Sequence, residues 1–370
     1  MNQKTMSTTE ILPRPAVQTA ATLKHRVREI RNYRELDALR GQWDLMAADS
    51  RPIASGFDYQ KAWAQGLSSG KQLRVIASDG AIAPLVKSRG FVGPLTLLAA
   101  EMFEPLDVVG STQDALEELA QAIRRTRLPV YLQRIPTDSL VIPALEKVYR
   151  AGAVVVKRPA AGAPIIHLNE TWIEPESHLN SGRRSDFRRA RRTAEKLGSV
   201  ETLILSPSPA EVPDLLDEVV RVEAAGWKGA AGTALDADPI RRDFFARYCD
   251  AEARRGRLRI CLLRIAEQNA AAQIAIQTPT RFSLLRAGYD EAFARSSPGN
   301  LLTRESIRHA ARSGIATYEF NGNVEPWTRL WTEDELACCS LRIFPLSLTG
   351  MTELLIQTAK TFLQRTTKHA

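Results

Sequence analysis

RFSLLRAGYDEAFARSSPGNLLTRESIRHAARSGIATYEFNGN, residues 281–323, is the stretch that decides the fold. An apolar run at 281–289, helical spacing at 301–313 and a second apolar run at 316–320 predict a strand, a helix and another strand. The helix begins directly after Ser-Pro-Gly-Asn at 297–300, so its first N–H groups and the positive end of its dipole are open to a ligand. A pyrophosphate or a carboxylate binds readily at such a helix start.

The start of that helix is therefore the first candidate for a binding site. Gly299 has no side chain, so a ligand can approach the backbone closely at this point. The alternative is an ordinary turn in which Asn300 caps the helix. If an anion is bound here, we expect it to lie against Ser297, Pro298, Gly299, Asn300 and Leu301.

Length and composition describe an ordinary globular chain. Its 370 residues suffice for two domains, and 44% of them are hydrophobic and 25% charged. The formal net charge of +8 favours acidic partners such as phosphates, nucleic acid or anionic lipid. The four cysteines show no CxxC spacing and the histidines form no HxxxH pair, so we expect no metal site. The sequence has no export signal and no apolar run of about 18 residues, which predicts a cytoplasmic protein without a membrane span.

Helix and strand patterns alternate through the chain, which predicts an α/β fold with a mixed sheet that splays at the ligand. We expect four segments: a disordered tail at 1–25, an amino-terminal domain at 26–163, a carboxy-terminal domain at 164–346 and a terminal helix at 347–370. Within the carboxy-terminal domain we expect a helix at 174–197 interrupted near Gly182, a helix at 239–255, a hairpin of strands 258–265 and 271–276, a helical region at 326–335 and a strand at 340–344.

Five short motifs, taken in order, resemble those of the CelD-like acetyltransferases, a family of the GNAT superfamily often found with bacterial cellulose or exopolysaccharide genes. They are the arginine-rich segment 181–196, Glu-Ala-Ala-Gly-Trp-Lys-Gly at 223–229, Gly-Tyr-Asp at 288–290, Ser-Pro-Gly at 297–299, and Tyr-Glu-Phe at 318–320 followed by Gly322. The resemblance covers about residues 26–346. This chain departs from the usual pattern at the turn, which has one glycine, and at Thr328, where the family often has a lysine.

The resemblance implies two tandem GNAT-like halves, the second more complete, and acyl transfer from acetyl-CoA or another acyl-CoA without a metal. The turn at 297–301 would hold the CoA pyrophosphate. The acceptor would be a small molecule or a saccharide with an amine or a hydroxyl. Two alternatives stay open: an aminoacyl-tRNA-dependent transferase of the Fem type, to which the layout is related, and a non-catalytic GNAT-fold component of a polysaccharide machine. Nucleic acid is the less favoured partner, because the chain has no long coiled-coil arm.

Acyl transfer needs a group that takes the proton of the acceptor, and a carboxylate can do so. Glu223 precedes the Trp-Lys-Gly segment, and Asp290 ends the strand beside the turn. Glu319 lies mid-strand, where burial would shift its pKa or require a cation. The alternative for Glu223 is a solvated carboxylate on a helix, and the alternative for Asp290 is an ordinary turn residue. Trp227 and Lys228 are candidates for a pocket wall and an anion contact, with an anchored exposed loop as the alternative.

The segment 181–196 contains six arginines and one lysine within one helix length. Arg184, Arg188, Arg191 and Arg192 fall on one helix face, where they repel one another unless anions lie between them. Arginine binds phosphate and carboxylate bidentately. We therefore expect an acidic ligand at Arg184, Arg188 and Arg192: CoA phosphates, a sugar nucleotide, an acidic polymer or RNA. The alternative is a solvated helix face.

Overall fold

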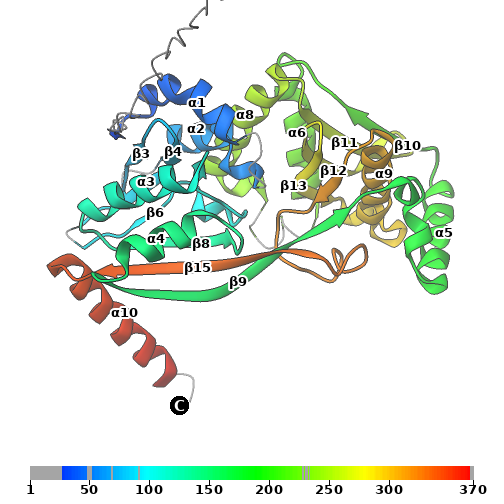
Figure 1. Ribbon diagram of the computed structural model, residues 1–370. Coiled ribbons are helices and arrows are strands. Elements are labelled where there is room, and N and C mark those ends of the chain that lie inside the picture. Colours follow the sequence, from blue (N-terminus) through cyan, green and yellow to red (C-terminus); the bar gives the residue numbers. More distant parts are fainter. Residues whose placement is uncertain are drawn as a thin grey trace, which may run out of the picture.

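The computed structural model describes residues 27–47, 52–67, 70–90, 92–226, 229, 232 and 234–366, with side chains up to residue 360 (Figure 1). The tail expected at 1–25 lies outside these residues. Two halves lie side by side in Figure 1, and two long strands run beneath both of them.

Eleven of the described strands form one mixed sheet that crosses both halves, in the order β10-β11-β12-β13-β14-β9-β15-β8-β6-β5-β2. Their bounds are β2 (Lys71–Leu73), β5 (Leu85–Ser88), β6 (Leu95–Leu97), β8 (Val130–Pro136), β9 (Ala153–His167), β10 (Val200–Leu205), β11 (Leu258–Ile265), β12 (Gln268–Gln277), β13 (Arg281–Tyr289), β14 (Thr317–Glu319) and β15 (Glu335–Pro345).

The two long strands β9 and β15 join the halves. They pair antiparallel along almost their whole length, from Glu335 opposite Pro164 to Pro345 opposite Ala153. β15 also pairs with β8 in the amino-terminal half, and the end of β9 pairs with β14 in the carboxy-terminal half. The expected boundary between residues 163 and 164 therefore falls inside a continuous strand.

The amino-terminal half adds a smaller sheet and four helices. The small sheet has the order β1-β3-β4-β7. Its strands are β1 (Arg28–Ile30), β3 (Val75–Ala77), β4 (Ala81–Ala83) and β7 (Val109–Gly110), and the helices are α1 (Arg40–Ala47), α2 (Phe57–Gln65), α3 (Gln113–Arg125) and α4 (Val141–Tyr149). Tyr59 and Trp63 of α2 pack edge-on against Phe244 of α8 (Pro239–Arg254), so one hydrophobic core continues from half to half.

In the carboxy-terminal half, α6 (Val212–Ala224) and α9 (Pro298–Arg312) cover opposite faces of the sheet. Ile274 and Ile276 of β12 belong to the core under α6, whereas Ala271 and Ala275 belong to the core under α9. This division follows from the alternation of side chains along a strand. α5 (Ser181–Glu195) lies outside α9 at one end of the molecule, and α10 (Leu348–Thr366) projects from the other end (Figure 1).

The predicted α/β fold with a mixed sheet in two halves is confirmed. The central prediction for residues 281–323 is also confirmed: β13 leads through the 3-10 helix η7 (Glu291–Ser296) into α9 and then β14. The structure likewise shows the expected helix at 239–254 and the hairpin of β11 and β12.

The interruption expected within the helix at 174–197 is present a little before Gly182: a 3-10 helix, η5 (Pro175–His178), ends before Asn180, whose side chain caps the helix α5. One local expectation was wrong. The region 326–335 forms turns instead of a helix, and β15 begins at Glu335, earlier than expected, because it pairs with β9.

Candidate active site

The sheet of the carboxy-terminal half opens at β13. β13 runs parallel to β14 and pairs with it only from Arg281 to Ser283. Beyond Ser283, no described strand pairs with this edge of β13, although its other edge stays paired with β12 as far as Tyr289. The predicted splay of the sheet is thus present beyond Ser283, where β14 no longer pairs with β13. The carbonyl of Leu284 there accepts a hydrogen bond of 3.2 Å from Nδ2 of Asn321.

A cavity of about 510 Å³ lies at this opening. One wall is β13 from Leu284 to Tyr289, and a second is the start of α9 from Pro298 to Thr303. The remaining lining residues are Glu104, Gln273, Ala294, Ser297, Phe320, Gly322, Glu325 and Trp327. The cavity therefore joins the predicted anion turn to β13, and Glu104 belongs to the amino-terminal half.

The start of α9 presents free backbone donors to this cavity. Ser297 occupies the N-cap position in the left-handed region, with φ 46°, and no side chain caps the helix. The N–H of Leu301 donates to the carbonyl of Ser297 at 3.1 Å, whereas the N–H groups of Gly299 and Asn300 have no acceptor within the described residues. Asn300 lies inside the helix, so the alternative in which Asn300 is the cap was wrong.

Gly299 faces the ring of Tyr289. A Cβ atom added at Gly299 would lie 3.4 Å from Cδ1 of Tyr289, which is an ordinary van der Waals contact. An alanine therefore fits at this position. A larger side chain would displace Tyr289 or project into the cavity.

Two polar groups at the cavity wall lack partners within the described part of the chain. Gln273 is 1% exposed; its Nε2 donates to Oγ1 of Thr303 at 3.0 Å, and its Oε1 has no donor. The Nε of Arg286 is buried without an acceptor. Buried polar atoms are normally paired, so these two atoms mark places where a ligand's own amide or carbonyl groups can bind.

Glu104 is a site residue that the sequence reasoning missed. Its Oε2 accepts a hydrogen bond of 2.9 Å from the hydroxyl of Tyr59. Burial raises the pKa of Glu104 to about 7, although the hydrogen bond from Tyr59 and the charges of Arg134 and Arg286 act in the opposite direction. Burial also raises the pKa of Tyr59, so its hydroxyl stays protonated and keeps donating. Glu104 thus combines a place at the cavity with a pKa near neutrality, which suits a group that exchanges protons.

Arg134 fixes the backbone around Glu104. It sits at a bulge of β8 with φ 55°, is 9% exposed, and donates to four backbone carbonyls. The acceptors are Ala161 (2.9 Å), Gly162 (2.8 Å), Gly322 (2.7 Å) and Phe103. Phe103 precedes Glu104 and Gly322 lines the cavity, so one guanidinium ties the loop of Glu104 to the wall in the other half.

The three predicted catalytic carboxylates hold structural contacts and do not belong to the described lining of the cavity. The Glu223 side chain is 1% exposed, forms an ion pair with Arg286 and accepts a hydrogen bond from the N–H of Leu235 at 3.0 Å. Asp290 accepts from the N–H of Ala292 at 2.9 Å, as a turn residue does. Glu319 accepts from the hydroxyl of Ser283 at 2.6 Å. Glu223 therefore orients Arg286 at the wall, and the catalytic roles of these carboxylates stay predictions.

The remaining predicted residues fall in three places. Trp227 and Lys228 lie outside the described residues. Thr328 is buried in a turn, where its hydroxyl donates to the carbonyl of Glu325 at 2.9 Å, and the neighbouring Trp327 lines the cavity instead. Arg184, Arg188 and Arg192 line a separate cleft between α5 and α9.

The described residues offer neither a metal site nor a membrane-spanning helix. In the part of the chain that the structure describes, no cluster of three or more His, Cys, Asp or Glu side chains could hold a metal ion. None of the described helices combines the length and the apolarity needed to cross a membrane.

Comparison with known proteins supports the superfamily. The family model of the acetyltransferase (GNAT) domain matches residues 181–329, which include β13, the turn and α9. A comparison with curated proteins gave no significant match. The match supports the GNAT superfamily for residues 181–329, and nothing in it distinguishes the CelD-like family.

Three solved structures share the fold across both halves at low identity. A conserved protein of unknown function from Bacteroides thetaiotaomicron has a TM-score of 0.57 and 12% identity, covering 86% of this chain and 99% of its own. The carboxy-terminal domain of a protein assigned as a lysylphosphatidylglycerol synthetase from Agrobacterium fabrum has a TM-score of 0.55 and 12% identity, with coverages of 87% and 96%. FemX has a TM-score of 0.53 and 10% identity, with coverages of 90% and 99%. At this identity the comparison establishes a shared fold alone.

Proposed function

We propose that this protein is an acyltransferase that moves an acyl group, acetyl in the simplest case, from acyl-CoA to an amine or a hydroxyl. The observation that carries the proposal is the coincidence of three features in one cavity: an uncapped helix start, the part of β13 that extends past its pairing with β14, and a carboxyl with a pKa of about 7. The helix start can bind the diphosphate of acyl-CoA, and the strand can accommodate its amide-containing arm. Acyl transfer needs a group that takes up a proton, and the carboxyl can do so.

The residues present fit acyl-CoA. The free N–H groups of Gly299 and Asn300 can bind the diphosphate, because the positive end of the helix dipole favours an anion there. Residues 284–289 of β13 extend past its pairing with β14 and line the cavity, so an extended arm can lie along this strand as a peptide does. The unpaired atoms Gln273 Oε1 and Arg286 Nε supply one acceptor and one donor beside it.

Glu104 is the proton acceptor in this proposal. The acceptor's N–H or O–H gives its proton to Glu104 as the new bond to the acyl carbon forms and the C–S bond breaks. Glu104 then releases this proton, the CoA thiolate takes up one proton, and the carboxylate is restored. Tyr59 holds the carboxyl in place, and the guanidinium of Arg286, which Glu223 orients, lies at the same wall, where oxygen of the acyl group gains negative charge. The apolar side chains of Leu285, Phe320 and Trp327 help to exclude water from the reaction.

The acceptor and the cellular setting rest on weaker support. An acceptor from exopolysaccharide or cellulose synthesis follows from the resemblance of the motifs alone. A cytoplasmic location is supported by the four cysteines, which are all buried and free, as in a reducing compartment.

The proposal is tested by ligand-induced stabilisation. Acetyl-CoA and tRNA are titrated separately into the full-length protein at fixed salt, and thermal unfolding is followed. A ligand at a hundredfold excess over its Kd stabilises by roughly 2.7 kcal/mol. We expect a shift with acetyl-CoA. A shift with tRNA alone would favour the aminoacyl-tRNA-dependent alternative, and no shift with either ligand would favour a non-catalytic role.

Substitution of Gly299 locates the binding. Gly299→Trp should lower the affinity for acetyl-CoA at least tenfold, because the indole projects into the cavity or displaces Tyr289. The matched control is Gly299→Ala, which the geometry accommodates, and its affinity should stay within about twofold of wild type. Equal affinities in both variants would contradict diphosphate binding at this turn.

A further inference from the structure

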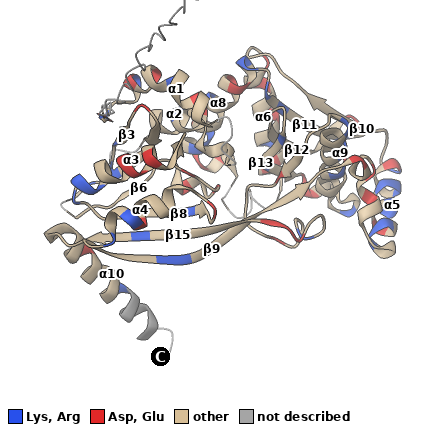
Figure 2. Cartoon of the chain, viewed as in Figure 1, with Lys and Arg blue, Asp and Glu red and all other residues tan. Residues whose placement is uncertain are grey.

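A second cleft, of about 570 Å³, lies between α5 and α9, and we call it the arginine cleft. It shares no lining residue with the cavity beside β13 and the start of α9, which we call the acyl cavity after the proposed function. Figure 2 shows Lys and Arg positions, coloured blue, along α5. Seven arginines line the cleft: Arg184, Arg188, Arg191 and Arg192 from α5, and Arg304, Arg308 and Arg312 from α9. The expected arginine face of α5 therefore meets a second arginine row, which recurs every four residues along α9.

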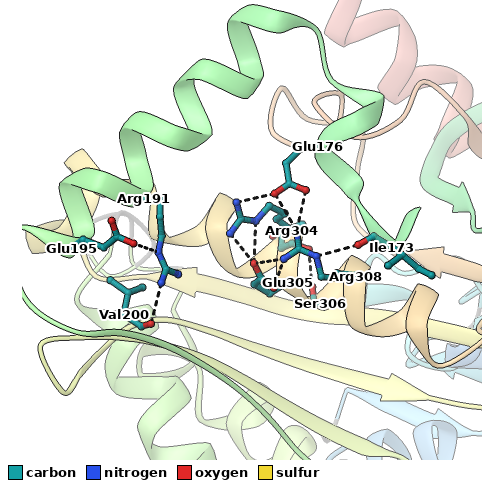
Figure 3. A network of polar contacts seen from close by, with 10 residues as sticks. Ile173, Glu176, Arg191, Glu195, Val200, Arg304, Glu305, Ser306 and Arg308 are labelled. Atoms are coloured by element: carbon teal, nitrogen blue, oxygen red, sulfur yellow. Dashed lines mark hydrogen bonds and ion pairs between the residues drawn. The ribbon is translucent and has the colours of Figure 1, made fainter. Parts of the chain in front are cut away.

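Three of these arginines are neutralised by carboxylates (Figure 3). Glu176 accepts from Arg304 and Arg308, each at 3.0 Å, and Glu305 pairs with the same two arginines at 2.7 Å. Arg191 pairs with Glu195 at 2.8 Å. This network stabilises the contact of η5 with α9 and accounts for most of the acidic side chains in the cleft.

The other four arginines keep their charge uncompensated. The side chains of Arg188, Arg192 and Arg312 have neither a hydrogen bond nor an ion pair within the described residues, and the side chain of Arg184 donates only to the carbonyl of Leu179, at 2.7 Å. Of the carboxylates that line the cleft, Glu174 is the one whose charge is not already used in an ion pair to a described residue. Positive charge therefore exceeds negative charge in a concave site, which strengthens its attraction for anions.

We infer that this cleft is a binding site for a small anion with at least two negative charges, such as a phosphorylated metabolite. Guanidinium groups from two helices that face one cleft repel each other, and an anion between them removes the repulsion. Each guanidinium can bind a phosphate with two parallel hydrogen bonds. The volume lies within the range of about 300–1,000 Å³ that small-molecule sites occupy.

The charge distribution favours a small ligand over a long polyanion. Glu174, Glu176 and Glu195 all line the cleft, so a nucleic acid or an acidic polysaccharide lying across it would meet carboxylates as well as arginines. A compact anion can contact Arg188, Arg192 and Arg312 and avoid them. The inference does not depend on acyl transfer, because no residue of the acyl cavity takes part.

The test uses inorganic pyrophosphate as the probe, titrated calorimetrically into the full-length protein at low ionic strength. The variant Arg188→Gln/Arg192→Gln should lose at least tenfold in affinity, and Arg312→Gln, on the other helix, should lose several-fold. The matched control is Arg183→Gln/Arg189→Gln, which removes the same charge from α5 at two exposed positions outside the cleft. We expect the control to stay within about threefold of wild type, since exposed distant charges are largely screened.

The titration is repeated with saturating CoA, because the start of α9 is also an anion site, and with heparin and tRNA. Pyrophosphate binding that depends on the cleft arginines and persists with CoA supports the inference. Equal losses in the cleft and control variants would mean a solvated basic surface and overturn it. Tight heparin or tRNA binding without pyrophosphate binding would mean that the cleft binds a polymer, and it would overturn the inference of a small anion. Loss of acetyl-CoA binding in the cleft variants would make the cleft part of the acyl-CoA site and also overturn the inference.

Discussion

The acyl cavity and the arginine cleft both use α9, yet they are built in different ways. The cavity uses the first turn of the helix, with backbone N–H groups, partly or fully buried polar side chains and residues from both halves of the chain. The cleft uses the later turns, with guanidinium groups from two neighbouring helices of one half, of which Arg184, Arg188, Arg192 and Arg312 are exposed. A single helix therefore offers positive potential twice, once from its dipole and once from its side chains.

The difference shows which properties each site depends on. In the cavity, function depends on position: Arg134, Tyr59 and Glu223 each hold a neighbouring group in place. In the cleft, affinity depends mainly on net charge, which several arginines share. We therefore expect single conservative substitutions to have large effects at the cavity and small effects at the cleft.

The largest effect should come from Glu104→Gln. The amide cannot take a proton, so the rate of CoA release from acetyl-CoA, followed as free thiol with amine or alcohol acceptors, should fall about 10²–10⁴-fold. The base form of Glu104 is populated as pH rises through about 7, so the wild-type rate should rise over this range and then level off. The variant should lose this dependence on pH.

Two controls keep this result interpretable. Glu101→Gln changes an exposed carboxylate three residues away, which pairs with Lys71, and should leave the rate unchanged. Acetyl-CoA affinity of Glu104→Gln should equal that of wild type. An unchanged rate and pH profile would remove Glu104 from the mechanism while leaving acyl-CoA binding intact.

An intermediate effect should come from Arg134→Lys. Lysine keeps the charge but not the planar fork, so several of the four carbonyls that Arg134 binds would lose their donor. The free energy of unfolding, measured by urea titration, should fall by about 2–3 kcal/mol. The exposed Arg158→Lys on β9 is the control and should change stability by less than about 0.5 kcal/mol. Arg134→Lys should also lower the affinity for acetyl-CoA and leave pyrophosphate binding at the cleft unchanged, because Arg134 fixes the wall of the cavity alone.

The smallest effect should come from salt. Raising the ionic strength from about 0.05 M to about 0.5 M should weaken pyrophosphate binding at the exposed cleft about tenfold. Acetyl-CoA binding should weaken less, by about twofold, because its cavity is less open to counterions and part of its affinity comes from apolar contact. The same salt sensitivity at both sites would contradict the contrast between position and charge.

Much of the fold was predictable because its signals are local. Residues 281–323 carry strand, turn and helix signals within one continuous segment, and the structure follows them. The full extent of β9 and β15 was not predictable, since it is set by pairing between residues about 180 positions apart. For the same reason a domain boundary near residue 163 looked natural in the sequence, although the chain is a continuous strand there.

The candidate site divides in the same way. The turn at 297–301 was found because a helix start after a glycine is visible in sequence, and the α5 arginines because their charge is concentrated. Arg304, Arg308 and Arg312 were missed, although their spacing of four was a readable signal. Glu104 offered no signal at all: its role depends on Tyr59 from α2 and on a cavity wall from residues 284–289, which only the folded chain brings to it.

The crossing of β9 and β15 has a practical consequence for work on this protein. A fragment cut to residues 181–329, the stretch that the family model covers, would contain β14 but neither of the two long strands. Its last strand would then present a bare row of amides and carbonyls to other molecules, which is a template for aggregation. Expression of the carboxy-terminal half alone should therefore yield insoluble material unless the fragment retains residues 153–167 and 335–345.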